Sequence, residues 1–107
     1  MLGLAGELGL AETEKMTKLR NQIVEFIKSG REFKGLYLQY ENLIMGIAEQ
    51  YRDDAFKKAQ IAHLILEASI FREGGDLEGY KEKINQAIEY AYGMHWDDMA
   101  EQISSAK

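Results

Sequence analysis

Apolar residues recur every three or four positions from residue 12 to residue 105, which is the spacing of amphipathic helices. No segment alternates apolar and polar residues as a half-buried strand would. Gly30 and the Gly74–Gly75 pair suit the left-handed residue that ends many helices, and proline is absent from the chain. The pattern predicts helices over residues of about 12–29, 31–51, 54–73, 77–92 and 97–105.

The boundary between the second and third predicted helices carries neither glycine nor proline. We nevertheless expect a break there, because Asp53 or Asp54 is suited to cap a new helix. An unbroken helix over residues 32–73 would also extend roughly 60 Å, which is long for a domain of this size. Gly35 and Gly46 lie inside the second helix, where each costs up to about 1 kcal/mol relative to alanine. A kink or a close helix–helix approach is expected there as compensation.

The helix predicted over residues 54–73 is apolar on more than one face, so we expect it to pack on several sides at the centre. Short connections make neighbouring helices antiparallel. The sequence therefore predicts an all-α fold of four to five antiparallel helices stacked as helical hairpins, in a bundle or a short repeat stack. We expect residues 12–107 to form this single helical domain and residues 1–11 to form a flexible apolar lead-in. In the fourth helix, the residues predicted to point inward are Leu77, Tyr80, Ile84, Ala87, Ile88 and Ala91.

The segment FREGGDLEGY, residues 71–80, joins the third and fourth predicted helices through a turn of Gly74, Gly75 and Asp76. Small and bulky residues flank this turn on both sides. The positions that carry the pattern are Ala68, Phe71, Gly75, Asp76, Leu77, Ala87, Ile88 and Tyr90.

On these positions, residues 61–94 resemble one tetratricopeptide (TPR) repeat, a helical hairpin of about 34 residues. Two residues depart from the family pattern, since Tyr80 stands where alanine is usual and no proline closes the unit at Tyr92. A generic helical hairpin with a Gly-Asp turn is the alternative interpretation. The resemblance implies protein–protein recognition through a helical groove and implies no catalytic residue.

Charge and composition restrict the function further. The chain of 107 residues has a net charge of −5, which disfavours non-specific nucleic-acid binding. It contains no cysteine, so disulfides and thiolate metal sites are excluded, and this composition suits the cytoplasm. No apolar run approaches the roughly 18 residues that a membrane span needs. We therefore expect a cytoplasmic, acidic protein without membrane contact.

Residues suited to metal binding or catalysis do not have the spacing of known motifs. His63 and Glu67, four residues apart, share a helix face, and a bundle enzyme or metal carrier using this pair is one hypothesis. A di-iron bundle needs Glu-x-x-His twice, and neither His63 nor His95 has glutamate three residues before it. The pairs Asp53–Asp54 and Asp97–Asp98 are explained by helix starts. We therefore expect no catalytic residue, no cofactor, no metal and no enzymatic activity.

Tyrosine and tryptophan are the one surplus in the composition, with 6 tyrosines and 1 tryptophan. Such residues are enriched in protein interfaces, because they join a large apolar area to a hydrogen-bonding tip. The sequence therefore predicts a small interaction module, an adaptor, inhibitor or regulator, whose partner is another protein or a second copy of the chain. The alternative is a nucleic-acid-associated regulator that uses the basic residues between positions 15 and 34. The predicted partner-contact residues are Tyr80, Tyr90, Tyr92, His95 and Trp96.

Overall fold

The computed structural model describes residues 13–105, which form five α-helices and no strand. The all-α prediction is confirmed, and so is the break between the second and third predicted helices. The predicted lead-in, residues 1–11, lies outside the described residues. The helices are α2 (Glu14–Ser29), α3 (Lys34–Ala48), α4 (Asp53–Gly74), α5 (Leu77–Gly93) and α6 (Asp97–Ser105).

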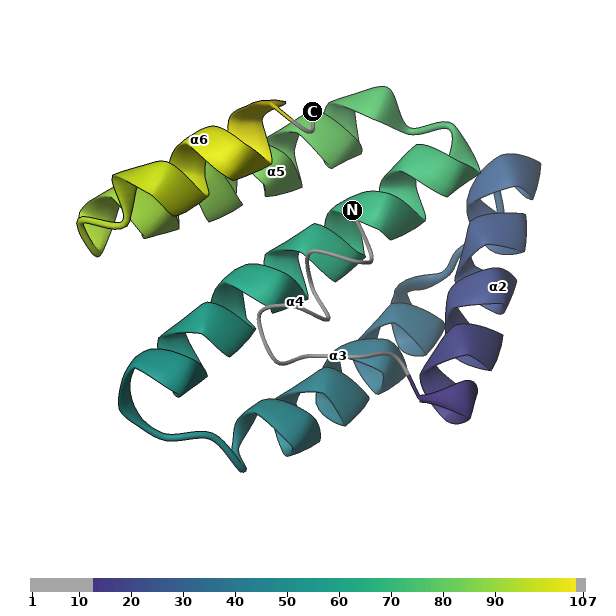
Figure 1. Cartoon of the computed structure of the whole chain (residues 1–107). Helices are drawn as coiled ribbons and strands as arrows, with labels where there is room; N and C mark the ends of the chain where they lie inside the picture. The colour runs from purple at the N-terminus through teal and green to yellow at the C-terminus, as the bar shows by residue number, and fades with distance from the viewer. Residues whose placement is uncertain (1–12, 106–107) are drawn as a thin grey trace.

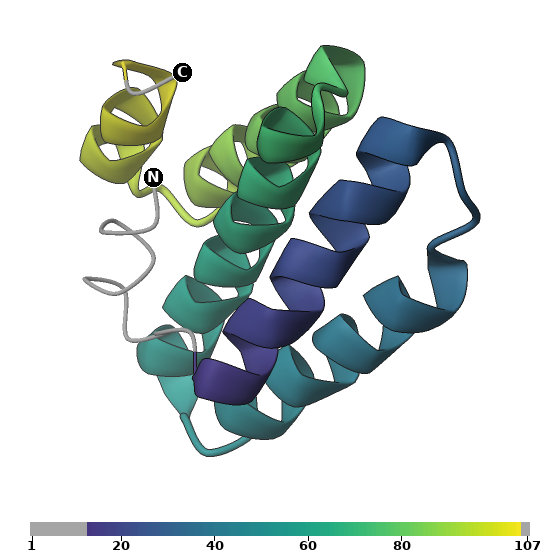
Figure 2. The ribbon, with the colours of Figure 1, turned by 90° about the vertical axis from the view of Figure 1, so that its right-hand side faces the viewer.

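Helix α4 occupies the centre of the molecule, as its all-round apolar sequence predicted. It packs against α5 on one side and against α2 and α3 on the other, and α6 lies against α5 (Figures 1 and 2). A helix that is packed on several sides must bury several faces, and α4 does so. Its buried residues are Ala59, Ile61, Ala62, His63, Ile65, Leu66, Glu67, Ala68, Ser69 and Ile70.

The α4–α5 turn has the structure that its glycines predicted. Gly75 adopts the left-handed conformation at φ 90°, and its N–H donates to the carbonyl of Arg72. The N–H of Asp76 donates to the carbonyl of Phe71 at 2.8 Å, which satisfies another free carbonyl at the end of α4. The Asp76 carboxylate then accepts the N–H of Gly79 at 3.0 Å and caps α5. Free backbone groups at the end of α4 and at the start of α5 therefore find hydrogen-bond partners within one short connection.

Glycine allows a close helix–helix approach at the end of α4 and not inside α3. A Cβ atom at Gly74 would stand 2.7 Å from Cγ2 of Ile27, so α2 lies directly against this position. No atom lies within 4 Å of a Cβ placed at Gly35 or Gly46. Of the two compensations expected at these positions, a kink or a close approach, the close approach is therefore absent, because both glycines face away from the neighbouring helices.

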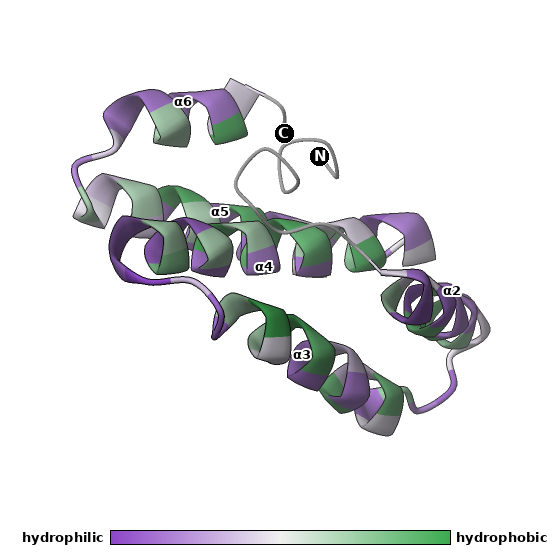
Figure 3. Cartoon of the chain, turned by 60° about the horizontal axis from the view of Figure 1, so that its bottom comes forward, coloured by the Kyte–Doolittle hydropathy of each residue, from purple (hydrophilic) through white to green (hydrophobic). Residues whose placement is uncertain are grey.

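Helix α3 carries apolar residues along most of its length (Figure 3). Tyr40, Ile44 and Ala48 are buried in it, and its other core-facing residues are partly buried against the core: Leu36, Tyr37, Leu43 and Ile47. Leu38 keeps 50% of its surface exposed, because α3 touches α4 over a short stretch only. Leu77, predicted to point inward, is 59% exposed because it is the first residue of α5 and precedes the packed turns.

The contact at Gly74 leads to a stability prediction. The substitution Gly74→Ala is expected to lower the free energy of unfolding by about 1–3 kcal/mol, because the new methyl group must displace the stiff, β-branched Ile27. Chemical denaturation of the variant measures this loss. In an Ile27→Ala background the same substitution should cost clearly less. The control, Gly46→Ala, is expected to raise stability by up to about 1 kcal/mol; equal effects at the two glycines would contradict the assignment.

Candidate functional site

Two polar side chains of α4 are buried on its face toward α3. His63 is 9% exposed and Glu67 is 3% exposed, although both belong to residue types that prefer the surface. Their spacing of four residues places them one helical turn apart on the same face. Burying a carboxylate without partners is costly, so the burial of Glu67 in this part of the core depends on its contacts.

Partners from three helices meet at the carboxylate of Glu67. The hydroxyl of Tyr37, on α3, donates a hydrogen bond to Oε2. Nζ of Lys83, on α5, lies 3.2 Å from the same oxygen. The other oxygen, Oε1, lies against Nε2 of His63 on α4 itself. The carboxylate is thus compensated on one oxygen by a hydroxyl and an ammonium group, and it presents the second oxygen to the imidazole.

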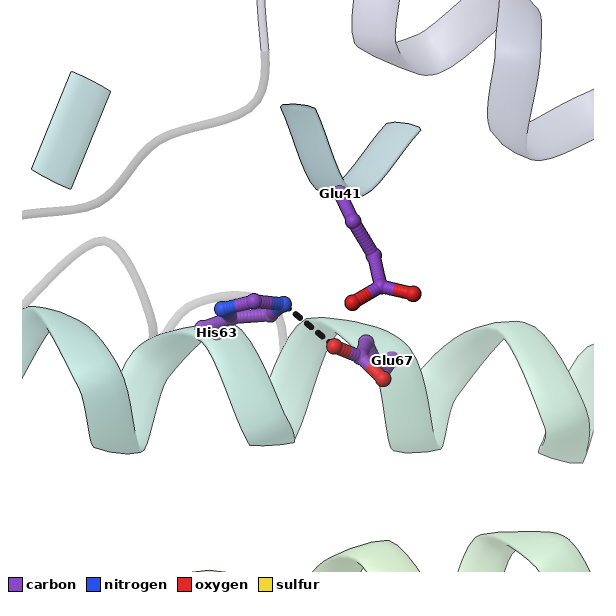
Figure 4. Close-up of side chains that lie close together, drawn as sticks. All are labelled: Glu41, His63 and Glu67. Carbon is purple, nitrogen blue, oxygen red and sulfur yellow. Dashed lines mark ion pairs between the residues drawn. The ribbon is translucent and has the colours of Figure 1, made fainter. Parts of the chain in front are cut away.

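A second carboxylate faces this pair from across the helix boundary. Glu41 is half-buried on α3, and its carboxylate points toward His63 and Glu67 (Figure 4). One ligand atom from each of the three residues lies within 4.8 Å of the other two. Within residues 13–105, this is the one group of three such side chains close enough to share a metal ion. Among these described residues, neither His95 nor Asp98 belongs to such a group.

The environment sets the charge states of the two buried groups. Burial lowers the pKa of His63 to about 4, and the Lys83 cation adds to this effect, so the imidazole is neutral at pH 7. Burial raises the pKa of Glu67, while the charge and the hydrogen bond of Lys83 oppose that rise. Nε2 of His63 has no partner in hydrogen-bonding geometry. The cluster therefore combines a neutral imidazole with two carboxylates, an arrangement that can take up a proton or a cation.

The predicted partner-contact residues separate into two groups. Tyr80 is 6% exposed and lies in the core, and its hydroxyl is buried, so it is not available as a surface residue in this fold. The other four gather where α5 ends and α6 begins. We call these four residues, Tyr90, Tyr92, His95 and Trp96, the aromatic corner.

The backbone of the aromatic corner is held by the end of α5. The N–H of Trp96 donates to the carbonyl of Ala91 at 2.9 Å, and the N–H of His95 donates to that of Tyr92 at 3.0 Å. This pair of bonds is a Schellman cap, which requires a left-handed residue, and His95 adopts that conformation at φ 62°. A histidine there is uncommon and costs roughly 1 kcal/mol or more. Trp96 is thereby placed in a fixed position directly after the cap.

Two depressions lie at the aromatic corner, next to the first turns of α4. One is lined by Tyr90, Gly93 and Met94 together with Lys57. The other is lined mainly by His95, Trp96 and residues of α6, and Nζ of Lys58 lies 5.8 Å from the centre of the Trp96 ring. The depression at Tyr90 thus combines aromatic and apolar surface with one cationic side chain, whereas Asp97 and Asp98 line the depression at Trp96 together with Lys58.

The acidic pairs lie at helix starts, as predicted, but not all of them act as caps. Asp97 and Asp98 occupy the first turn of α6, where the helix dipole favours negative charge. Helix α4 begins at Asp53, and its N-cap is Arg52, whose side chain makes no capping bond. Asp53 instead has φ 54°, the left-handed region, which a sequence pattern does not reveal. The prediction that Asp53 or Asp54 occupies the cap position is therefore wrong.

Glu41 is the member of the buried cluster that sequence reasoning missed. His63 and Glu67 share a helix and a recognisable spacing, whereas Glu41 precedes His63 by 22 positions and lies on another helix. A weak signal was present, because Glu41 directly follows the buried Tyr40 in an otherwise apolar stretch. Only the packing of α3 on α4 brings the three side chains together.

Among the described residues, no helix has both the length and the apolar character required to cross a bilayer. Comparison of the chain with protein-family models, with curated proteins and with solved structures finds no match in any of the three.

The lowered pKa of His63 leads to a prediction about acid stability. Its pKa is about 4 in the folded state and about 6.5 when unfolded, so the unfolded chain binds the proton first as the pH falls. The free energy of unfolding, measured on EDTA-treated protein, should therefore fall between pH 6.5 and pH 4. The contribution of His63 to this fall is roughly 3 kcal/mol. The Tyr37, Glu41, Glu67 and Lys83 side chains surround this imidazole, and the raised pKa of Glu67 acts in the opposite direction.

The His63 contribution is therefore measured as a difference between variants. Urea denaturation at several pH values should show a stability loss in the wild type that His63→Gln largely lacks. The matched control, His95→Gly, removes the exposed histidine. Its free energy of unfolding should fall with pH as steeply as that of the wild type. Identical slopes in the wild type and in His63→Gln would contradict the assignment.

Proposed function

We propose that this protein is a small helical interaction module that binds another protein through the aromatic corner. The observation that carries the proposal is that Tyr90, His95 and Trp96 line two depressions at the α5–α6 connection, with the exposed Tyr92 on the last turns of α5. Aromatic residues in such positions supply much of the binding energy of protein interfaces. No catalytic step is part of the proposal.

The exposure of Tyr92 and the backbone conformation of His95 support this function. Tyr92 keeps 47% of its surface exposed, although burial would stabilise so large a side chain. His95 maintains an unfavourable left-handed conformation beside it, where glycine would relieve the strain. Because the cap fixes the backbone at Trp96, few additional rotatable bonds would lose their freedom on binding. This lowers the entropic cost of association.

The depressions also suggest what the partner presents. The depression between Tyr90 and Met94 is apolar apart from Lys57 at its edge. An apolar side chain with a carboxylate next to it would fill this space and pair with the ammonium group. Lys58 also lines the neighbouring depression at Trp96, but Asp97 and Asp98 offset its charge there. We therefore propose a partner segment that carries an apolar anchor residue for the Tyr90 depression, with one acidic residue beside it to pair with Lys57.

The α4–α5 hairpin is compatible with the proposed kinship to TPR repeats. In that family a small residue lets the two helices approach, whereas this chain has Tyr80 there. Gly79, one residue earlier, offers a replacement, because a Cβ at that position would stand 3.0 Å from the ring of Phe71. The close contact is thus moved by one position, which supports a TPR-like hairpin as the scaffold of the proposed module.

The nucleic-acid alternative has weaker support. Lys18 pairs with Glu14 at 3.7 Å, Arg20 forms an ion pair with Glu73, and the guanidinium of Arg31 lies 4.2 Å from the centre of the Phe26 ring. Binding a phosphate backbone requires cations that are free to neutralise it, and these side chains are engaged within the chain. Self-association has a different candidate surface, the exposed face of α3 with Leu38 and Met45.

Affinity capture with matched baits tests the proposal. Wild-type protein and the variants Tyr92→Ala, His95→Gly and Leu38→Ala are each immobilised, and retained proteins are identified by mass spectrometry. We expect a partner that the wild type and Leu38→Ala retain and that Tyr92→Ala loses. Purified partner should bind Tyr92→Ala at least tenfold more weakly, since exposed interface tyrosines contribute roughly 1.4 kcal/mol or more.

The variant His95→Gly separates binding from stability. It should unfold at higher denaturant concentration than the wild type and still bind more weakly, because the strain is relieved while a contact is lost. Equal retention by all four baits would count against the aromatic corner. Loss in Leu38→Ala alone, together with a dimer in solution, would indicate self-association through α3 instead.

A further inference from the structure

We propose that Glu41, His63 and Glu67 form a binding site for one divalent transition-metal ion, of which Zn²⁺ is the simplest example. The site lies between α3 and α4, whereas the aromatic corner lies at the end of α5 and in the α5–α6 connection. This inference therefore stands independently of the proposed interaction function.

The distances between the donor atoms suit such an ion after a small movement. The three ligand atoms lie within 4.8 Å of one another. A tetrahedral zinc ion with bonds of about 2.0–2.1 Å holds its ligands about 3.3 Å apart. Glu41 is half-buried at the edge of the cluster, and rotation about its side-chain bonds brings its carboxylate closer without a change in the backbone.

The imidazole of His63 provides an independent indication of a ligand. Its side chain is buried, and Nε2 points at the two carboxylates without a partner in hydrogen-bonding geometry (Figure 4). Nε2 lies against Oε1 of Glu67 without making a hydrogen bond to it, whereas buried polar atoms in native proteins nearly always have one. A metal ion between the imidazole and the two carboxylates would provide that partner.

The contacts of Glu67 determine which of its two carboxylate oxygens faces His63 and Glu41. Tyr37 and Lys83 both hold Oε2, so Oε1 is the atom that remains toward His63 and Glu41. Metal-ligating carboxylates are commonly fixed in this way by a second set of contacts, which reduces the cost of ordering them. Two of the three proposed ligands are therefore already positioned by the fold.

The donor types determine the class of ion. One imidazole nitrogen with two carboxylate oxygens suits Zn²⁺, Fe²⁺ or Mn²⁺, and the nitrogen disfavours Mg²⁺ and Ca²⁺, which prefer oxygen alone. Three protein ligands leave a position for water on the side of the half-buried Glu41. A bound ion would join α3 to α4, whose direct packing is the least extensive among the described helix pairs in contact.

Zinc binding to EDTA-treated, full-length protein tests the inference. Calorimetric titration with ZnCl₂ should show one ion per chain, and saturating zinc should raise the melting temperature by at least about 5 °C. The substitution Glu41→Gln should weaken zinc binding at least tenfold, and His63→Gln at least as much. A millimolar excess of Mg²⁺ should leave the zinc affinity within twofold.

Two controls make the result specific to this site. Glu89→Gln removes an exposed glutamate on α5, and His95→Gly removes the other histidine of the chain, and both should keep the wild-type affinity within twofold. Glu41→Gln is expected to fold normally because its side chain is half-buried, so the inference can be tested even if His63→Gln does not fold. Absence of stoichiometric binding, or an affinity that Glu41→Gln leaves unchanged, would overturn the proposal, as would loss of binding in His95→Gly.

Discussion

The carboxylate of Glu67 is the constraint on which the arrangement of α3, α4 and α5 depends. A buried carboxylate is tolerated only when its oxygens have partners, and Tyr37, His63 and Lys83 supply them from the three helices. Replacing such a network by apolar residues is often neutral or stabilising, whereas removing one member leaves an unpaired group. We infer that the network determines which helix faces meet rather than adding net stability.

Helix α3 shows why this constraint matters. It buries Tyr40, Ile44 and Ala48 and packs against α2, but its direct packing on α4 is limited. The hydrogen bond of Tyr37 to Glu67, and the approach of Glu41 to the same cluster, lie on its side toward α4 and contribute to its position there. The proposed metal ion would act at this same boundary, which gives the cluster a structural role whether or not chemistry takes place there.

Three helices of this chain end in the same backbone capping motif, but different residues occupy its left-handed position. Helices α2, α4 and α5 all finish with a left-handed residue and the paired hydrogen bonds of a Schellman cap. Glycine occupies that position at Gly30 and Gly75, where it costs little, and histidine occupies it at His95. The exception coincides with the exposed aromatic corner, which is why strain and proposed function are linked there and not at the other two turns.

The helices, their order and the central place of α4 follow from apolar periodicity and from Gly30, Gly75 and Asp76, because these signals act over a few residues. Three features appear only once the helices are packed: Glu41 joins His63 and Glu67, Tyr80 is buried, and Leu77 is exposed. These outcomes depend on which helices pack together and how far along their length. Spacing within one helix carries no information about a neighbour distant in sequence, so side chains that meet between helices could not be derived from it.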